Sequence, residues 1–262
     1  VLPARVSYFL LPLLKQVEKY TFSKVSKVNL VSRGFTDYFA ERYPKLDYEF
    51  LTNGIDDEFL DMQSARPKNG GAADGVKTLL YAGNIGEGQG LHKIIPALAL
   101  KLGKMYRIIV IGDGSRKLHL LREIERAEVK NVELITPMNR RQLLDYYQSA
   151  DVLFLHLNDH RAFRKVLPSK IFEYSAFPSP ILAGVSGYPA EFIGNNVENA
   201  KVFTPCDVDS ALLALQKLEH QQTQRKDFIA RFKRSKIMGK MANSLLQLAK
   251  DKSVEIVCQK SC

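Results

Sequence analysis

The chain has 262 residues, of which 45% are hydrophobic and 25% charged, and its formal net charge is +10. These are the proportions of a globular protein of one or two domains, and they exclude a disordered, collagen-like or coiled-coil chain. No apolar run reaches the ~18 residues that a transmembrane helix needs. The three cysteines are too few for a disulfide framework and form no CxxC pair that would indicate zinc, so we expect no metal site.

The net charge is concentrated in the two terminal segments. Residues 1–30 carry five basic residues and one acid, and residues 217–262 carry eleven basic residues and four acids, whereas residues 31–216 have a net charge of −1. A basic nucleic-acid-binding core is therefore excluded, and we expect no nucleic-acid partner.

The first 60 residues predict about one and a half strand–helix units, which are too few to bury a core alone. The expected elements are a helix over 7–21, a strand over 27–31, a helix over 35–43 and a strand over 47–51. A Pro- and Gly-containing stretch, 67–71, follows as a linker or loop.

Strands and helices alternate from about residue 77. Short apolar runs predict strands over 77–83, 107–112, 132–136, 151–157, 180–184 and 201–203. Helices are expected over 91–102, 115–127 and 139–149, from about 169, and from Asp207 through 218, with Asn139 and Asp207 as N-caps. This alternation predicts an α/β fold, a Rossmann-like parallel sheet with helices on both faces. One long basic helix with an apolar stripe is expected over 223–250.

A glycine-rich loop, Gly83–Gly90, separates the first of these strands from its helix. Glycines allow the backbone to approach a ligand closely, and the amides at the start of a helix favour an anion such as phosphate. The spacing is neither a dinucleotide GxGxxG nor a Walker GK[ST], and a tight turn without a ligand is the alternative.

Two further motifs fall at the same edge of the predicted sheet. Gly112-Asp113-Gly114 follows the second strand, where ligands collect in open parallel sheets. Pro168, Ser169 and Lys170 would place a hydroxyl and a cation at a helix start, with Glu173 one turn later on the same face. A carboxylate there can accept two hydrogen bonds from the vicinal diol of a ribose, although a capped helix with a solvated ion pair is an equal alternative.

The ordered set YAGNIGEGQG, VIGDGS, ITPMNRRQLLDYYQSADVLFL, PSKIFEYSAFPSPILA and GYPAEFI resembles the nucleotide-binding half of family 4 glycosyltransferases of the GT-B fold. It also resembles a subgroup that transfers sugars, often N-acetylated, in bacterial surface-polysaccharide assembly. The resemblance covers about residues 27–250. It implies a remnant of an N-terminal acceptor domain with a linker in 1–66, a nucleotide-sugar-binding domain in 67–220, and a crossing helix with a basic tail in 221–262.

The resemblance also implies roles for matching residues. Gly83 and Gly90, with Gly112, shape the loops under the diphosphate, and Pro137 and Met138 border the base. Glu173 matches the second Glu of the family's E-x7-E motif and would hold the ribose, while Pro168 and Ser169 would line the donor-sugar side.

Three positions depart from the family pattern. Asn84 stands where the family usually has Arg, Gln89 where it has Lys, and Lys165 where it has the first Glu of the motif. We expect Lys170 to supply the missing positive charge at the diphosphate, and we name no catalytic residue because such groups would lie largely in a preceding domain.

The function implied is a retaining glycosyltransferase that uses a nucleoside-diphosphate sugar, which we expect to be a UDP-(N-acetyl)hexosamine, without a separate cofactor. About 130–150 residues of an N-terminal domain are expected before Val1, so this chain alone would bind UDP and transfer nothing. The alternatives are a nucleotide-sugar-binding domain without activity, a GT-B nucleotide-sugar 2-epimerase and a phosphorylase. The acceptor would be a glycan or a lipid-linked glycan.

The charge distribution predicts where such an enzyme works. The surplus of basic residues falls on the N-terminal remnant and on the crossing helix, which the GT-B arrangement assigns to one lobe. We therefore expect a cytoplasmic protein that contacts the anionic inner face of the cell membrane, at about 1 kcal/mol for each basic residue near the surface.

Overall fold

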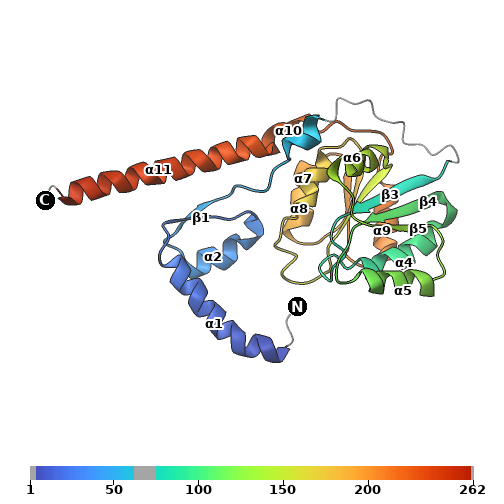
Figure 1. Ribbon diagram of the computed structural model, residues 1–262, viewed down its shortest axis with the longest axis horizontal. Helices are drawn as coiled ribbons and strands as arrows, with labels where there is room; N and C mark the ends of the chain where they lie inside the picture. Colours follow the sequence, from blue (N-terminus) through green and yellow to red (C-terminus); the bar gives the residue numbers. More distant parts are fainter. Residues whose placement is uncertain (1–3, 62–74, 261–262) are drawn as a thin grey trace.

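The computed structural model describes residues 4–61 and 75–260 of the chain, and it is built around a parallel six-stranded sheet (Figure 1). The sheet has the order β5-β4-β3-β6-β7-β8. Its strands are β3 (Lys77–Ala82), β4 (Tyr106–Ile111), β5 (Val132–Ile135), β6 (Val152–His156), β7 (Ile181–Gly184) and β8 (Ala200–Phe203). The chain moves outward from β3 to β5 and then returns to β6 on the other side of β3. The predicted parallel α/β sheet is confirmed, and its order reverses between β3 and β6.

Helices cover both faces of the sheet, as expected for strands that are apolar throughout. Successive residues of β3 enter different cores: Leu79 and Tyr81 pack on one face, Leu80 and Ala82 on the other. The first face is covered by α4 (Leu91–Leu102), α5 (Lys117–Arg126) and α9 (Val208–Gln216). The second face is covered by α6 (Arg140–Ser149), α7 (Lys170–Ser175), α8 (Tyr188–Asn196) and α10 (Lys226–Phe232). A short 3-10 helix, η3 (Gly103–Met105), follows α4.

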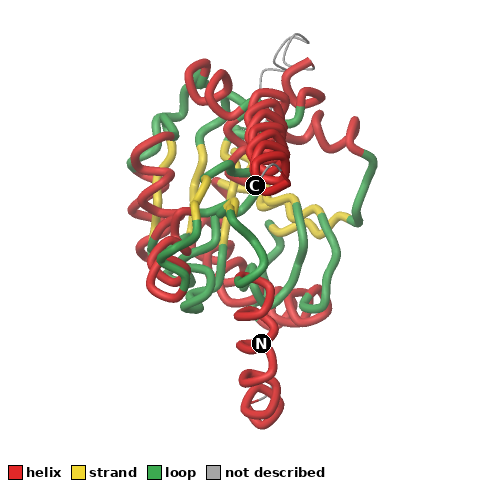
Figure 2. Tube along the Cα trace, turned by 90° about the vertical axis from the view of Figure 1, so that its left-hand side faces the viewer, coloured by secondary structure: helices red, strands yellow, loops and turns green. Residues whose placement is uncertain are grey.

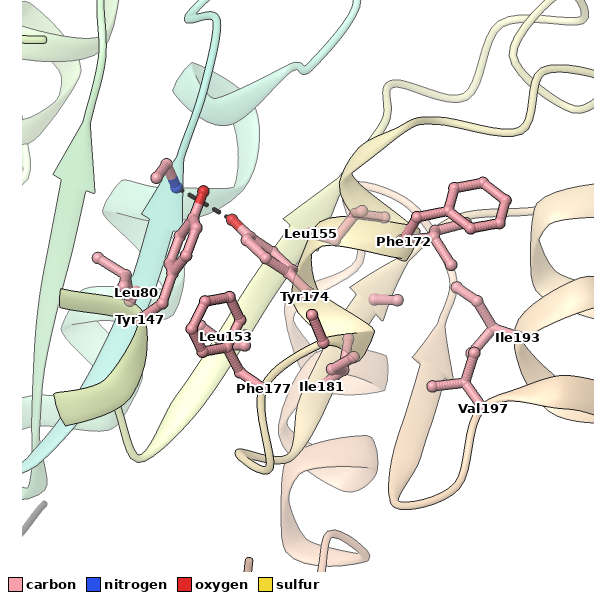
Figure 3. Close-up of a cluster of buried hydrophobic side chains, with 14 of the residues drawn as sticks. Leu80, Tyr147, Leu153, Leu155, Phe172, Tyr174, Phe177, Ile181, Ile193 and Val197 are labelled. Atoms are coloured by element: carbon pink, nitrogen blue, oxygen red, sulfur yellow. Dashed lines mark hydrogen bonds between the residues drawn. The ribbon is translucent and has the colours of Figure 1, made fainter. Parts of the chain in front are cut away.

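The core of the second face includes two buried tyrosines whose hydroxyl groups form hydrogen bonds (Figure 3). Tyr174 is fully buried, and its hydroxyl accepts a hydrogen bond from the Ala82 amide at 3.0 Å. Tyr147 packs edge-on against Tyr174, with ring centroids 5.4 Å apart. These tyrosines fix α6 and α7 against the end of β3, where the candidate site described below lies.

The N-terminal segment forms a small unit beside this body. It comprises α1 (Ala4–Phe22), β1 (Lys27–Asn29), η1 (Arg33–Phe35), α2 (Thr36–Arg42), β2 (Asp47–Glu49) and α3 (Asp57–Asp61). The strands β1 and β2 pair in parallel. Glu18 of α1 accepts hydrogen bonds from Tyr38 and Tyr43, and Phe22 stacks on Tyr43. The predicted order of two helices and two strands is confirmed.

The C-terminal helix departs from the prediction. Instead of one helix over 223–250, the chain forms α10 and α11 (Arg234–Lys260), which are separated at Lys233. The break follows from a pairing with distant chain: the Ile55 amide donates to the Phe232 carbonyl and the Arg234 amide donates to the Ile55 carbonyl. The predicted apolar stripe is therefore divided, because Phe228 is buried whereas the corresponding side chains of α11 are exposed. The exposed ones are Met238, Leu245 and Leu246.

Both ends of the chain extend away from the α/β body. Figure 2 looks nearly along α11 and shows α1 projecting from the body at the N-terminal end. Within residues 4–61 and 75–260, none of the helices combines the length and the hydropathy that crossing a membrane requires.

Candidate functional site

A cavity of about 340 Å³ opens at the carboxyl ends of β3 and β4, the edge where open parallel sheets bind ligands. It is lined by Ala82, Gly83, Asn84, Ile111, Gly112, Asp113, Pro137, Met138, Leu143 and Lys170. Six of these residues were predicted from separate motifs: Gly83, Asn84, Gly112, Pro137, Met138 and Lys170. The fold therefore brings four distant stretches of sequence to one cavity.

A larger cavity of about 600 Å³ lies at the opposite end of the sheet. Lys77 and Tyr106, the first residues of β3 and β4, line it with His220 of a later loop. It borders neither the glycine-rich loop nor the Gly112 turn, and it lies at the amino ends of the strands. The smaller cavity is therefore the better candidate for a nucleotide.

Gly112 is required by the close approach of two loops. The Gly83 amide donates to the Ile111 carbonyl at 2.9 Å, and a Cβ atom on Gly112 would overlap the Gly83 carbonyl oxygen. The loops that follow β3 and β4 thus pack backbone against backbone. The wall of the cavity depends on this contact.

We predict opposite effects for alanine at two glycines. Gly112→Ala should lower the free energy of unfolding by about 2 kcal/mol or more, because backbone atoms must move to admit the methyl group. Gly194→Ala should raise it by about 0.5–1 kcal/mol, since Gly194 lies within α8 with open space at its Cβ position. Urea unfolding measures both; a Gly112→Ala protein as stable as Gly194→Ala would contradict the packing described.

The glycine-rich loop is held together by the side chains of Asn84 and Gln89. The Asn84 side-chain amide donates to Gln89 Oε1 at 2.9 Å, and the Gly86 amide donates to the same oxygen at 3.2 Å. Gly90 has a left-handed backbone, with φ of 59°, at the N-cap of α4. Gln89 and Gly90 therefore shape the loop and do not line the cavity themselves.

Lys170 is the one cation among the residues that line the cavity. Its Nζ lies 2.7 Å from Glu173 Oε2 and 3.3 Å from the Tyr147 hydroxyl, which in turn lies 3.4 Å from Glu173 Oε2. Burial, with the Glu173 charge as a second cause, raises the pKa of Tyr147 far above its ordinary value. The tyrosine is thus a neutral donor that supports the Lys170–Glu173 pair.

Pro168 and Ser169 do not reach the cavity lining. Ser169 stands at the N-cap of α7, but its side chain makes no capping hydrogen bond, so the hydroxyl does not serve the cap suggested by the sequence. Glu173 is likewise outside the lining and is connected to the cavity through Lys170. Among these four residues the structure places only Lys170 directly at the cavity.

Lys165 is directed toward the N-terminal segment. Its ammonium lies 5.8 Å from the centroid of the Tyr38 ring, and its backbone carbonyl accepts a hydrogen bond from the Ser32 hydroxyl. Gly34 packs directly against the Lys165 backbone. The strand-to-helix segment after β6 is therefore joined to η1 and α2 at this position.

Arg140, at the start of α6, pairs with two acidic residues from a distant part of the sequence. Its guanidinium lies 2.7 Å from Asp56 Oδ2 and 3.0 Å from Glu58 Oε2, above the Phe59 ring. It therefore joins the start of α6 to the segment that enters α3. The N-cap predicted at Asn139 is confirmed, since its side chain accepts from the Gln142 amide.

Three polar residues, His156, Asp159 and His160, lie at the end of β6 and in the loop that follows it. The structure separates them: His156 is buried at the end of β6, whereas Asp159 pairs with Arg164 at 2.8 Å. Its Nδ1 lies 2.6 Å from the Gln89 carbonyl oxygen, and its Nε2 accepts from the Cys206 amide at 2.9 Å. The imidazole is therefore neutral, with its proton on Nδ1.

No group of side chains suited to a metal occurs in the parts of the chain that the structure describes.

This buried histidine should make stability depend on pH. Burial lowers the pKa of His156 to about 4, against about 6.5 in an unfolded chain. Because the unfolded chain binds the proton more tightly, this contribution is present above about pH 6.5 and is lost as the pH falls toward 4, by up to about 3 kcal/mol. The drop in unfolding free energy between roughly pH 7 and pH 4.5 should be smaller in His156→Gln than in the wild type. Equal drops in the two proteins would rule out this role.

Comparison with solved structures places the architecture among known folds. The chain superposes on a trehalose 6-phosphate synthase from Burkholderia multivorans with a TM-score of 0.71 at 14% identity, covering 96% of this chain and 64% of that one. HepE from Anabaena, solved with UDP and glucose, gives 0.61 at 16%, with 84% and 63% covered. The lipopolysaccharide outer core galactosyltransferase WaaB gives 0.64 at 13%, with 85% and 62% covered. The chain thus spans less than two thirds of the length of each of these proteins.

Comparison of the sequence gives the family. No curated protein sequence matches the chain significantly. The family model described as "Glycosyl transferases group 1" matches residues 62–235, which is more than half of the chain and contains every residue that lines the cavity. The family match agrees with the resemblance seen in the ordered motifs. The position of the cavity, near the point between β3 and β6 where the strand order reverses, agrees with it as well. The chain belongs to the glycosyl transferases group 1 family.

Proposed function

We propose that this chain is the donor-binding part of a retaining GT-B glycosyltransferase, and that its cavity binds a nucleoside-diphosphate sugar with UDP as the nucleotide. The observation that carries the proposal is the cavity itself, where two glycine-containing loops, the apolar pair Pro137 and Met138, and Lys170 meet. Among the structural relatives, HepE was solved with UDP and glucose. The donor sugar that we propose is an N-acetylhexosamine, by resemblance of the motifs to the surface-polysaccharide subgroup.

Each part of the nucleotide has a matching surface. We place the base against Pro137 and Met138, and the diphosphate over the backbone of the Gly83 and Gly112 loops. Glu173 would accept hydrogen bonds from the ribose hydroxyls. Lys170 and Glu173 are paired with each other in the structure, so ligand binding would exchange that ion pair for contacts with the diphosphate and the ribose.

The chemistry that the chain supplies is stabilisation of the leaving group. As the bond from the sugar to the diphosphate breaks, negative charge grows on the phosphate oxygens. A cation held at a fixed place in a partly buried site stabilises that charge. Lys170 is 23% exposed and is supported by Tyr147, so it suits this role in place of the cations absent at Asn84 and Gln89.

Hydrogen–deuterium exchange with and without UDP tests the location. Saturating UDP should slow exchange in the segments that carry Gly83, Gly112, Met138 and Lys170. Exchange around Lys77, Tyr106 and His220, which line the larger cavity, should not change. Protection confined to that second cavity, or none at all, would refute the proposal.

We propose that residues 1–66 belong to an acceptor domain whose other strands precede this chain. The two-stranded sheet β1–β2 is too small to be stable alone. A longer protein should transfer sugar, whereas this chain should bind UDP without transferring.

The competing functions are a binding domain without activity, which the departures at Asn84, Gln89 and Lys165 favour, and a 2-epimerase. An assay of the longer protein with a UDP-sugar and a glycan acceptor separates these three outcomes.

A second observation supports contact with an anionic membrane surface. Exposed apolar side chains lie along α1, which also carries Lys15 and Lys19, and they are Leu10, Leu11, Leu13, Leu14 and Val17. We propose that this helix and the basic helix α11 face lipid that carries the acceptor, on the cytoplasmic side. Vesicle sedimentation should show binding to anionic but not neutral vesicles, lost when residues 240–262 are removed, a truncation that leaves α10 and its buried Phe228 in place. Equal binding to both vesicle types would exclude an electrostatic contact.

A further inference from the structure

The glycine-rich loop is held from the end of β6 by two buried polar residues. Three consecutive carbonyl oxygens of the loop are engaged there. The Glu87 oxygen accepts from the Asn158 side chain at 3.1 Å, the Gly88 oxygen from the Asn158 backbone amide at 2.8 Å, and the Gln89 oxygen lies 2.6 Å from His156 Nδ1. His156 is 1% exposed and Asn158 is 4% exposed.

The same two residues are fixed on their other sides. His156 Nε2 accepts from the Cys206 amide, and Asn158 Oδ1 accepts from Lys93 Nζ at 3.2 Å. Both imidazole nitrogens are thus used in one tautomer, so the ring cannot flip without losing two hydrogen bonds. The pair connects β6, the glycine-rich loop and the turn that follows β8.

The connection continues from the loop to the cavity. Gln89, whose carbonyl faces His156, uses its side-chain oxygen to accept from Asn84 and from the Gly86 amide. Asn84 lines the cavity, whereas neither His156 nor Asn158 does. A change at His156 can therefore reach the cavity through Gln89 and Asn84.

We infer that His156 and Asn158 are positioning residues that set the shape of the diphosphate-binding loop. The inference rests on the proposed function, because it assigns the glycine-rich loop to the diphosphate. The inference predicts different effects on the binding of UDP and of uridine, whereas general destabilisation of the fold would weaken both. The base and ribose surfaces at Pro137, Met138 and Glu173 lie on other elements, so binding of uridine should be insensitive to the pair while binding of UDP depends on it.

The test compares UDP with uridine in matched variants. His156→Phe keeps the ring shape but loses both hydrogen bonds, and it should weaken UDP binding about tenfold with uridine unchanged. His156→Gln can donate to Gln89 and accept from Cys206 at the same time, and it should restore most of the affinity for UDP. Asn158→Asp, which loses the donor to Glu87, should lower the UDP-to-uridine affinity ratio as His156→Phe does, and it serves if His156→Phe fails to fold.

Ser179→Ala is the control for stability alone. Ser179 is 2% exposed and donates to the Ala150 carbonyl, before the start of β6 and away from the loop. This variant should lose stability and keep the wild-type ratio of affinities. If His156→Phe or Asn158→Asp weakens both ligands equally, or neither, the inference is wrong. If wild-type protein binds uridine and UDP equally or binds neither, the proposed function itself fails.

Discussion

Replacing Glu173 by alanine should weaken binding of UDP by at least about a hundredfold. The carboxylate would accept two charge-assisted hydrogen bonds from the ribose, and bonds of this kind contribute about 1.5–3 kcal/mol each. In the free protein Glu173 is engaged by Lys170 and lies near Tyr147, so the carboxylate is already aligned. Calorimetric titration with UDP measures the loss.

The choice of ligand and control makes this prediction specific. Because the ribose belongs to both molecules, uridine should lose affinity by a similar factor. Glu191→Ala removes an exposed carboxylate from the first turn of α8 and should leave both affinities unchanged. Undiminished UDP binding by folded Glu173→Ala protein would show that the ribose lies elsewhere.

Lys170→Met should weaken the binding of UDP but not that of uridine, whereas Glu173→Ala should weaken both. The substitution keeps an apolar stem and removes the one cation that lines the cavity, so UDP should bind about a hundredfold more weakly while uridine binds nearly as before. The affinity of wild-type protein for UDP should also fall with added salt more steeply than that of the variant.

Lys104→Met is the matched control. Lys104 is exposed in η3, far from the carboxyl ends of the strands, and its loss should change neither affinity nor salt dependence. If Lys170→Met weakened uridine as much as UDP, the lysine would be supporting Glu173 and not contacting the diphosphate.

The parts of the fold that were predictable from sequence are those with local signals. The bounds of α4 match the expected helix over 91–102, because Gly90 and Gly103 flank a continuous apolar face. Asn139 and Asp207 cap their helices as expected, since a capping side chain acts within three residues. The α8 helix was not predicted, although Gly187 and Pro189 are the kind of residues that precede and begin a helix.

What could not be predicted depends on contacts between distant segments. The break at Lys233 follows from hydrogen bonds with Ile55, and nothing local to residues 226–240 indicates it. The pairing of Arg140 with Asp56 and Glu58 could not be predicted, because these acids approach it only in the folded chain. The glycines, Pro137, Met138 and Lys170 could be assigned to one site because each follows a strand of a parallel sheet. The pairing of Lys170 with Glu173 and the role of His156 required the side-chain positions.

Isothermal titration of the folded wild-type chain with UDP tests the central claim most directly. We expect one UDP to bind per chain, in competition with a UDP-sugar, and with an affinity that falls when Glu173 or Lys170 is replaced. A chain that is folded by circular dichroism and shows no binding of UDP, or that binds it undiminished in both variants, would contradict the assignment of this cavity to a sugar nucleotide.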